Sequence, residues 1–118
     1  MYEIKEIKLT NAGLKKKRLI ITFHDEKLAL LSGFLMTDAL LLNGHVLQLL
    51  RDVLEEKKNA TTFCGNRCYL QINKNNAKLE DLFNDTNGIK PHHSVKIKTK
   101  KLYTLTKMWL DRLKHYNL

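Results

Sequence analysis

The chain has 118 residues, of which 43% are hydrophobic and 28% charged, and its net charge is +9. These values exclude a disordered chain and are typical of one globular domain that is long enough to bury a core. One proline and five glycines leave no room for a long flexible linker. We therefore expect residues 1–118 to form a single compact domain.

One stretch, residues 28–50, is long and apolar enough to be considered as a membrane span. Its single formally charged residue, Asp38, would lie near the bilayer centre, at a cost of about 2.5 to 3.5 kcal/mol. Two consecutive core helices are the better interpretation. The charged beginning of the chain also lacks the apolar run of a secretory signal. We expect a protein of the cytoplasm with no membrane partner, in which both cysteines stay reduced.

The first 23 residues carry the alternating apolar pattern of two strands. The alternation changes phase between Ile4 and Ile7, which suggests a bulge or a twist. Residues 11–13, Asn-Ala-Gly, are a turn signal. Residues 18–23 then resume the pattern, and together the two segments predict an antiparallel hairpin. The residues on one face of the second strand are Leu19, Ile21 and Phe23.

Two helices are expected next. Asp25 can cap a helix that begins directly after it, because its carboxylate accepts hydrogen bonds from backbone N–H groups. Residues 28–31 fit either this helix or a third strand, and periodicity does not decide between them. The clearest helix of the chain follows, capped by Thr37 or Asp38, with Gly44 inside it at a cost of about 1 kcal/mol. Its apolar positions are Leu42, Val46, Leu49, Leu50, Val53 and Leu54, and residues 55–58 extend it into solvent.

Both cysteines of the chain lie in the stretch FCGNRCYLQI, residues 63–72. Gly65-Asn66 is a hairpin-turn signal, because glycine readily adopts the positive φ that a two-residue loop requires. In that register Cys64 faces Arg67, and the two thiols point to opposite faces and cannot pair. If the run were one continuous strand, the thiols would share a face but lie too far apart for a disulfide. The core-facing positions of the second strand are Cys68, Leu70 and Ile72.

A zinc site is not expected from these cysteines. Zinc needs about four ligands, often from two closely spaced pairs, and here the spacing is C-x3-C with no second cysteine pair. His92 and His93 could supply the two missing ligands of a Cys2His2 site by number alone. Adjacent side chains of a strand point apart, so the two histidines would not face one ion. The cysteines are better explained as ordinary small residues, one of them in the core.

The remaining chain completes the predicted fold. Residues 77–83 fit a strand or one helical turn, and the spacing slightly favours the turn. Residues 94–98 predict a short strand, and Thr99 caps a last helix. The apolar stripe of that helix is Leu102, Leu105, Trp109, Leu113 and Tyr116. The expected fold class is α+β, with an antiparallel sheet of four or five strands packed on one side by two or three helices.

No arrangement of residues typical of catalysis is present. The chain lacks a glycine-rich phosphate loop, an HExxH motif, a nucleophile elbow and a C-x2-C pair. Glu55-Glu56 is explained as a solvated helix face, and His45 as a partly buried residue of an apolar helix face. We expect no enzymatic activity, no cofactor and no bound metal.

The positive charge is concentrated in the last third of the chain, where residues 86–118 contain eight Lys or Arg against Asp111 alone. Such a field attracts an anionic partner or keeps the fold soluble. Lysines on exposed strands also protect sheet edges against aggregation. The candidate binding surface is Lys96, Lys98 and Lys100 along one strand face, Lys101, Lys107, Arg112 and Lys114 on the last helix, and Lys15, Lys16, Lys17 and Arg18 at the hairpin.

Three stretches, FCGNRCYLQI (63–72), AKLEDLF (77–83) and KTKKLYTLTKMWL (98–110), together resemble small bacterial proteins of polymorphic toxin systems, of the immunity or antitoxin type. The resemblance covers the last half of the chain and implies a binding role without catalytic residues. Inhibitors of basic nucleases tend to be acidic, whereas a chain with a net charge of +9 suits an acidic target surface.

Two functions are therefore expected from the sequence. The first is a non-enzymatic bacterial binding protein, similar to an immunity protein or inhibitor, whose basic C-terminal surface occludes an acidic protein partner. The second is a small basic nucleic-acid-binding protein of a phage or mobile element. Lysine outnumbers arginine in the chain, which suits non-specific contact with phosphates better than base reading.

Overall fold

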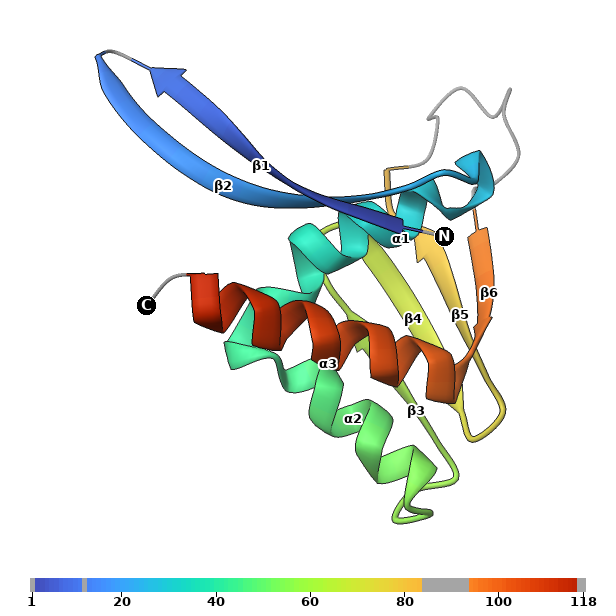
Figure 1. The fold of residues 1–118 in the computed structure, drawn as a ribbon. Helices are drawn as coiled ribbons and strands as arrows, with labels where there is room; N and C mark the ends of the chain where they lie inside the picture. The colour runs from blue at the N-terminus through green and yellow to red at the C-terminus, as the bar shows by residue number, and fades with distance from the viewer. Residues whose placement is uncertain (1, 12, 84–93, 117–118) are drawn as a thin grey trace.

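The computed structural model describes residues 2–11, 13–83 and 94–116, and Figure 1 shows how they are arranged. Four strands form an antiparallel sheet in the order β3-β4-β5-β6, and three α-helices pack against one side of it. The predicted α+β class is confirmed. The strands are β1 (Tyr2–Asn11), β2 (Leu14–Phe23), β3 (Ala60–Cys64), β4 (Cys68–Asn73), β5 (Asn76–Asp81) and β6 (Ser94–Lys98). The helices are α1 (Ala29–Met36), α2 (His45–Leu54) and α3 (Thr99–Tyr116), with short 3-10 helices η1 (Glu26–Leu28) and η2 (Asp38–Asn43).

The predicted N-terminal hairpin is present as a separate two-stranded sheet. Strand β1 pairs with β2 residue for residue, so no bulge interrupts the region between Ile4 and Ile7. The strands instead twist about each other, and the far end of the hairpin extends beyond the helices (Figure 1). Gly13, at φ +80°, supplies the left-handed turn residue, and β2 begins at Leu14, earlier than predicted. The predicted inner face is confirmed, since Ile21 is buried and its two neighbours on that face are half-buried.

The first helical segment follows the predicted cap. The Asp25 carboxylate accepts a hydrogen bond from the backbone N–H of Lys27 at 3.0 Å, and η1 begins directly after it. Residues 28–31, for which strand and helix were both open, lie in the end of η1 and the start of α1. Four residues of α1 enter the core, Leu30, Leu31, Phe34 and Leu35.

The prediction of a long helix that begins after Thr37 or Asp38 is wrong about where the helix begins. Residues 38–43 form η2 instead, and α2 starts only at His45. Leu42, Asn43 and Gly44 all have positive φ, at 52°, 58° and 80°, so the chain turns left-handed for three residues before α2 begins. Gly44 is therefore the residue that precedes the helix and not a residue within it. At the other end, α2 stops at Leu54, and residues 55–58 do not extend it.

The predicted turn between β3 and β4 is present but lies one residue later. The backbone N–H of Gly65 donates to the Cys68 carbonyl at 2.8 Å, so Asn66 and Arg67 are the central residues of the turn. Cys64 consequently faces Tyr69 and not Arg67. The two cysteines still point to opposite faces, as predicted, and both are free thiols, with Cys64 exposed and Cys68 buried.

The segment 77–83, for which a helical turn was slightly favoured, contains strand β5 instead. It pairs with β4 on one side and β6 on the other, and Ala77 and Leu79 are buried at alternate positions. The short strand predicted at residues 94–98 is confirmed as β6. Thr99 is the first residue of α3, and its buried hydroxyl donates to the carbonyl of Asn73 on the sheet.

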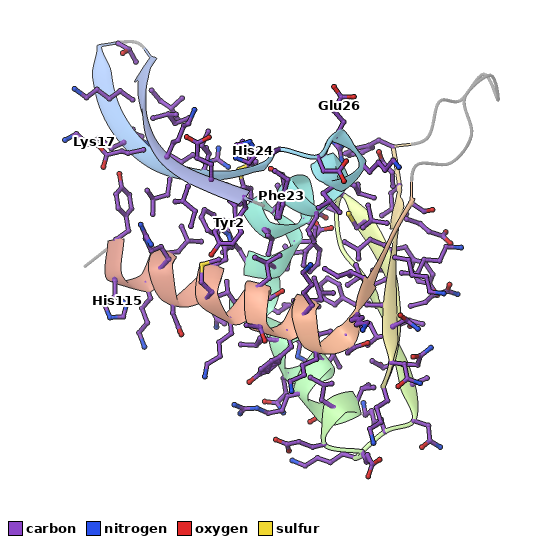
Figure 2. All side chains as sticks on the ribbon, turned by 45° about the vertical axis from the view of Figure 1, so that its right-hand side comes forward. Tyr2, Lys17, Phe23, His24, Glu26 and His115 are labelled. Carbon is purple, nitrogen blue, oxygen red and sulfur yellow. The ribbon has the colours of Figure 1, made fainter. Side chains whose placement is uncertain are left out.

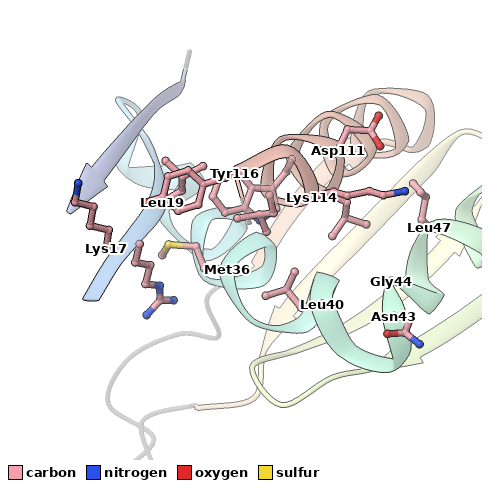
Figure 3. A pocket seen from close by; sticks show the side chains of 14 residues that line it. Lys17, Leu19, Met36, Leu40, Asn43, Gly44, Leu47, Asp111, Lys114 and Tyr116 are labelled. Carbon is pink, nitrogen blue, oxygen red and sulfur yellow. The ribbon is translucent and has the colours of Figure 1, made fainter. Parts of the chain in front are cut away.

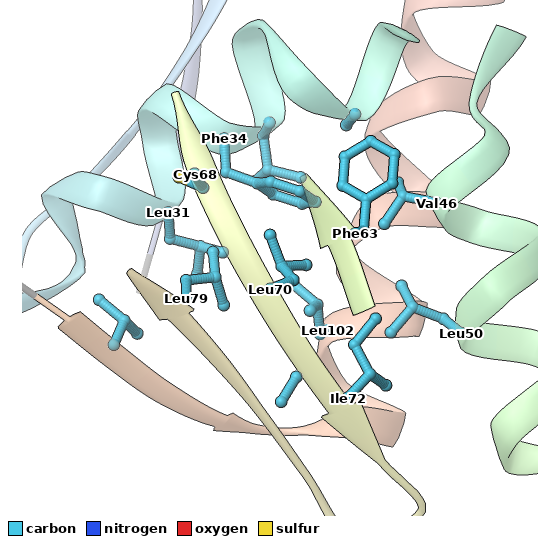
Figure 4. Close-up of a cluster of buried hydrophobic side chains, with 14 of the residues drawn as sticks. Leu31, Phe34, Val46, Leu50, Phe63, Cys68, Leu70, Ile72, Leu79 and Leu102 are labelled. Atoms are coloured by element: carbon cyan, nitrogen blue, oxygen red, sulfur yellow. The ribbon is translucent and has the colours of Figure 1, made fainter. Parts of the chain in front are cut away.

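The core lies between the sheet and the three α-helices (Figure 4). Leu70 and Leu79 from the central strands meet Phe34 of α1 and Leu102 of α3 there, all essentially without exposure. Trp109 is also buried, and its indole N–H donates to the Leu35 carbonyl at 2.6 Å, which joins α3 to α1. The other members of the predicted α3 stripe, Leu105, Leu113 and Tyr116, are half-buried. None of the described helices is long and apolar enough to cross a membrane.

Candidate binding grooves

Six of the predicted basic residues line two separate grooves. Lys96, Lys98 and Lys101 line one groove, and Lys17, Arg18 and Lys114 line another. The remaining described cations are exposed outside both grooves, namely Lys16, Lys100, Lys107 and Arg112. The side chain of Lys15 lies outside the described residues. The candidate residues therefore contribute to two grooves with different surroundings.

The first site, the strand-edge groove, lies between β6, α3 and the base of the hairpin. Its volume is about 770 Å³. Residues far apart in the sequence form it, because the hairpin base and α1 meet the last strand and the last helix there. Its lining is Tyr2, Phe23, Leu28, Leu31, Lys96, Ile97, Lys98, Lys101, Thr104, Leu105 and Met108.

The apolar wall of the strand-edge groove comes from two directions. Tyr2 and Phe23 are register partners at the open end of the hairpin, with ring centroids 6.1 Å apart, and Figure 2 shows them between the hairpin and α3. From α3, Leu105 and Met108 face the groove at helical spacing. Ile97 adds a half-buried side chain from β6. A ligand that enters this groove therefore meets a mostly apolar wall.

The charge at the strand-edge groove has one sign. Among the described residues, its only charged lining residues are Lys96, Lys98 and Lys101, and all three are exposed. Within the described part of the chain none of the three lies within ion-pair distance of a carboxylate. Lys96 also lies directly opposite Lys78 in the β5–β6 register. Lys78 forms an ion pair with Glu80 at 3.3 Å, whereas Lys96 has no such carboxylate among the described residues.

The second site, the hairpin groove, lies between the hairpin, η2 and the C-terminal half of α3 (Figure 3), with a volume of about 800 Å³. Its lining is Lys17, Arg18, Leu19, Met36, Leu40, Asn43, Gly44, Leu47, Trp109, Leu110, Asp111, Leu113, Lys114 and Tyr116. It differs from the strand-edge groove because a carboxylate, Asp111, is part of its lining.

One cation of the hairpin groove already has a carboxylate nearby. Lys17 Nζ lies 4.0 Å from Glu6 Oε1, and the Tyr116 hydroxyl donates to Glu6 Oε2 at 2.9 Å. Loss of hydration, and then the hydrogen bond to Glu6, raise the pKa of Tyr116 above its ordinary value. This contact joins the end of α3 to β1, so part of the groove's polar lining holds the hairpin against the body of the protein.

Two titratable residues considered in the sequence, Cys68 and His45, line neither groove. Burial, and then the carboxylates of Asp38 and Asp81, raise the pKa of the Cys68 thiol to about 12, so it stays protonated at neutral pH. His45, expected to be partly buried, is exposed at the start of α2. No group of three His, Cys, Asp or Glu side chains among the residues described is arranged to hold a metal ion. His92 and His93 lie outside those residues, and the absence of enzymatic activity stays a prediction.

Sequence reasoning found the lysines of the strand-edge groove but missed its apolar lining. Tyr2 and Phe23 were assigned only to a hairpin, and Leu28 and Leu31 only to a helix or a third strand. Tyr2 and Phe23 fall at the two ends of the predicted hairpin, which is the one signal that places them side by side. Nothing in the sequence indicates that this hairpin end lies against β6 and α3.

No family model matches the chain, and no curated protein and no solved structure matches it either.

Proposed function

We propose that this chain is a non-enzymatic protein-binding domain whose strand-edge groove takes an acidic, partly apolar segment of a protein partner. The observation that carries the proposal is the combination in one groove of an apolar wall and three lysines that, among the described residues, have no carboxylate within ion-pair distance or in the same lining. An apolar segment alone would leave the lysines without partners, and a purely anionic ligand would leave the apolar wall uncovered.

The two parts of the groove have different roles in the proposed binding. Burying the partner's apolar side chains against Leu105, Met108 and the hairpin base supplies affinity, because apolar area is removed from water. The lysines select acidic segments and speed their approach, since complementary charge raises association rates more than affinity. The net charge of +9 extends this attraction beyond the groove itself.

The biological consequence we propose is occlusion. A partner segment held in the groove would be covered by the body of this protein and kept from its own target, as an inhibitor or immunity protein does in a bacterial cytoplasm. The resemblance of three C-terminal stretches to immunity-type proteins and the lack of catalytic motifs support this role. The partner segment is proposed to be acidic because the charged residues that line the groove are lysines.

The proposal is tested by selecting peptides from a displayed random library on the wild-type protein. Counter-selection uses a Lys98→Glu/Lys101→Glu double variant, which reverses the groove charge. The matched control is Lys107→Glu/Arg112→Glu, which makes the same change in charge at exposed α3 positions outside both grooves. We expect the selected peptides to combine Asp or Glu with apolar residues, to bind the control, and to bind the groove variant at least tenfold more weakly. Peptides without acidic enrichment, or equal binding to both variants, would refute the proposal.

A second candidate function, nucleic-acid binding, is favoured by the hairpin. Its outer half carries Lys8 directly opposite Lys17, with Arg18 and Lys16 next to them, and it extends beyond the helices (Figure 1). A two-stranded ribbon fits the major groove of a duplex, and lysines there would neutralise phosphates. The test is fluorescence anisotropy of labelled single- and double-stranded oligonucleotides at low and near-physiological salt. This function predicts binding that weakens steeply with salt and is lost in Lys8→Glu/Lys16→Glu but not in Lys107→Glu/Arg112→Glu.

A further inference from the structure

We propose that the partner segment binds as an additional β-strand on the outer edge of β6, with acidic and apolar residues alternating along it. This inference rests on the proposed function and gives the partner a backbone conformation and a sequence pattern. Strand addition to an exposed sheet edge is a general mode of peptide recognition, in which main-chain hydrogen bonds give affinity and alternate side chains give specificity.

The hydrogen-bond register shows which backbone groups of β6 are free for such a strand. The backbone N–H of Thr99 donates to the Asn75 carbonyl at 3.2 Å, which continues the β5–β6 ladder by one pair. Antiparallel strands alternate between hydrogen-bonded and non-hydrogen-bonded pairs. Val95 and Ile97 therefore bond to β5, whereas the N–H and C=O groups of Lys96 and Lys98 point away from it, and β6 is the last strand of its sheet in the described part of the chain.

The strand-edge groove lies along this same edge. Lys96, Ile97 and Lys98 of β6 line it, and no residue of β5 does, which places it on the outer side of β6. The opposite edge of the sheet is β3, which contributes no residue to either groove and whose outward-facing residues, Ala60, Thr62 and Cys64, carry no formal charge. Of the two edges, β6 thus combines backbone groups that have no partner among the described residues with an apolar groove and positive charge.

The alternation of side chains on β6 predicts the sequence of the added strand. Ile97 points to the helix side of the sheet, beside Leu105 and Met108, whereas Lys96 and Lys98 point to the other face, where they are exposed. Side chains of a neighbouring strand fall next to these on the same two faces. Residues of the partner on the helix side therefore enter the groove and are apolar, and those on the other face lie beside the two lysines and are acidic.

The lysines also disfavour pairing of this edge with a second copy of the chain. Exposed strand edges promote aggregation, and lysine side chains at an edge oppose pairing between identical chains because the charges repel. The same charges favour an acidic strand. Lys96 and Lys98 thus discriminate between a second copy of this chain and an acidic partner.

The experiment uses two labelled nine-residue peptides of identical composition and fluorescence anisotropy with the full chain. One is alternating, Gly-Asp-Ile-Asp-Val-Asp-Ile-Asp-Gly, and the other is segregated, Gly-Asp-Asp-Asp-Asp-Ile-Val-Ile-Gly. We expect the alternating peptide to bind at least tenfold more tightly. A series of single N-methyl substitutions along the alternating peptide then removes one backbone donor at a time. We expect losses of tenfold or more at every second position and small effects between them, because only alternate backbone groups face β6.

A pair of protein variants tests the same edge from the other side. Lys96→Pro removes the outward N–H of β6 without removing a bond to β5, and proline is tolerated on an edge strand in that orientation. Lys96→Ala removes the same charge but keeps the N–H. We expect Lys96→Pro to bind the alternating peptide at least fivefold more weakly than Lys96→Ala, with thermal unfolding used to show that both variants are folded.

The outcomes separate this inference from the function on which it rests. If library-selected acidic peptides bind the groove but the N-methyl series shows no two-residue period, the strand geometry is wrong and the proposed function stands. The N-methyl series uses the wild-type protein, so this conclusion holds even if Lys96→Pro fails to fold. If no acidic and apolar peptide is sensitive to Lys98→Glu/Lys101→Glu, both proposals are wrong.

Discussion

The carboxylate of Asp38 occupies the space that a side chain at Gly65 would need. A Cβ built on Gly65 would lie 2.7 Å from Asp38 Oδ1 and closer still to Oδ2 and Cγ. From this position the carboxylate accepts hydrogen bonds from the backbone N–H groups of Asn66, Arg67 and Cys68 at 2.8, 3.0 and 2.7 Å. Asp38 is fully buried, so a single charged residue holds the β3–β4 turn against η2.

Replacing Gly65 with alanine tests this close approach. We expect Gly65→Ala to lower the free energy of unfolding by about 1 to 3 kcal/mol, because the new methyl group forces the carboxylate away from the turn. Gly33→Ala is the matched control, since its Cβ would meet only Arg67, 3.6 Å away, and alanine favours the helix by up to about 1 kcal/mol. Urea unfolding followed by Trp109 fluorescence measures both. Equal effects of the two substitutions would contradict the packing described for Gly65.

Replacing Asp38 with asparagine tests the hydrogen bonds themselves. Asn keeps the shape of the side chain but presents an NH2 group and one oxygen to three backbone donors. We expect Asp38→Asn to cost about 3 kcal/mol, because a hydrogen bond to a charged group is lost and a buried donor is left without a partner. Urea unfolding measures the loss. Hydrogen exchange should show that the amides of residues 66–68 lose protection, whereas unchanged protection there would mean that the carboxylate does not hold the turn.

The buried thiol of Cys68 should make stability depend on alkaline pH. Its pKa is raised to about 12 in the folded protein from an ordinary value of 9.0, mainly by burial. Well below pH 9 the thiol is protonated in both the folded and the unfolded state, so it does not change the free energy of unfolding. Between pH 9 and 12 the unfolded chain releases the proton and the folded chain does not, so the free energy of unfolding falls as pH rises.

The measurement is the pH dependence of urea unfolding from pH 8 to 11 in the wild type and in two alanine variants. Cys68→Ala should flatten the alkaline slope by the contribution of one thiol, although it also lowers stability at neutral pH through lost packing. Cys64→Ala, at the exposed thiol of the pair, should keep the wild-type slope. If Cys68→Ala has the same slope as the wild type, the pKa of Cys68 is not raised in the folded state.

The sequence predicted the elements whose signal is local and missed those that depend on a distant partner. The hairpin, the Asp25 cap, β6 and α3 follow from alternation, helical spacing and capping chemistry, all contained in a few neighbouring residues. The class of the fold follows from these elements. The sequence predicted an antiparallel sheet of four or five strands, and the structure has one of four strands. The hairpin forms a second, two-stranded sheet.

Asp38 illustrates why the rest was missed. A Thr-Asp pair before an apolar run is a helix-start signal, and the sequence does not show that three backbone donors 28 to 30 residues away bind the carboxylate instead. The same tertiary contact fixes the turn one residue later than Gly65-Asn66 predicts. In the segment 77–83, Leu79, Leu82 and Phe83 match helical spacing, yet β5 forms there as a strand because it pairs with β4 on one side and β6 on the other. The candidate site was half predicted, because charge is visible in a sequence and the apolar wall is made by tertiary packing.

Leu42 is the last residue for which the structure makes a testable prediction. It has φ 52° and is 79% exposed. A bulky residue therefore adopts a left-handed backbone conformation although its side chain gains little burial. A left-handed conformation costs an ordinary residue about 1 to 2 kcal/mol, and asparagine tolerates it better. We expect Leu42→Asn to raise the free energy of unfolding by up to about 1 kcal/mol. Leu41→Asn is the control with the opposite sign, because Leu41 has φ −62° and packs against the core. Urea unfolding measures the free energy of unfolding of both variants. If Leu42→Asn is as destabilising as Leu41→Asn, the Leu42 side chain makes stabilising contacts that its exposure does not show.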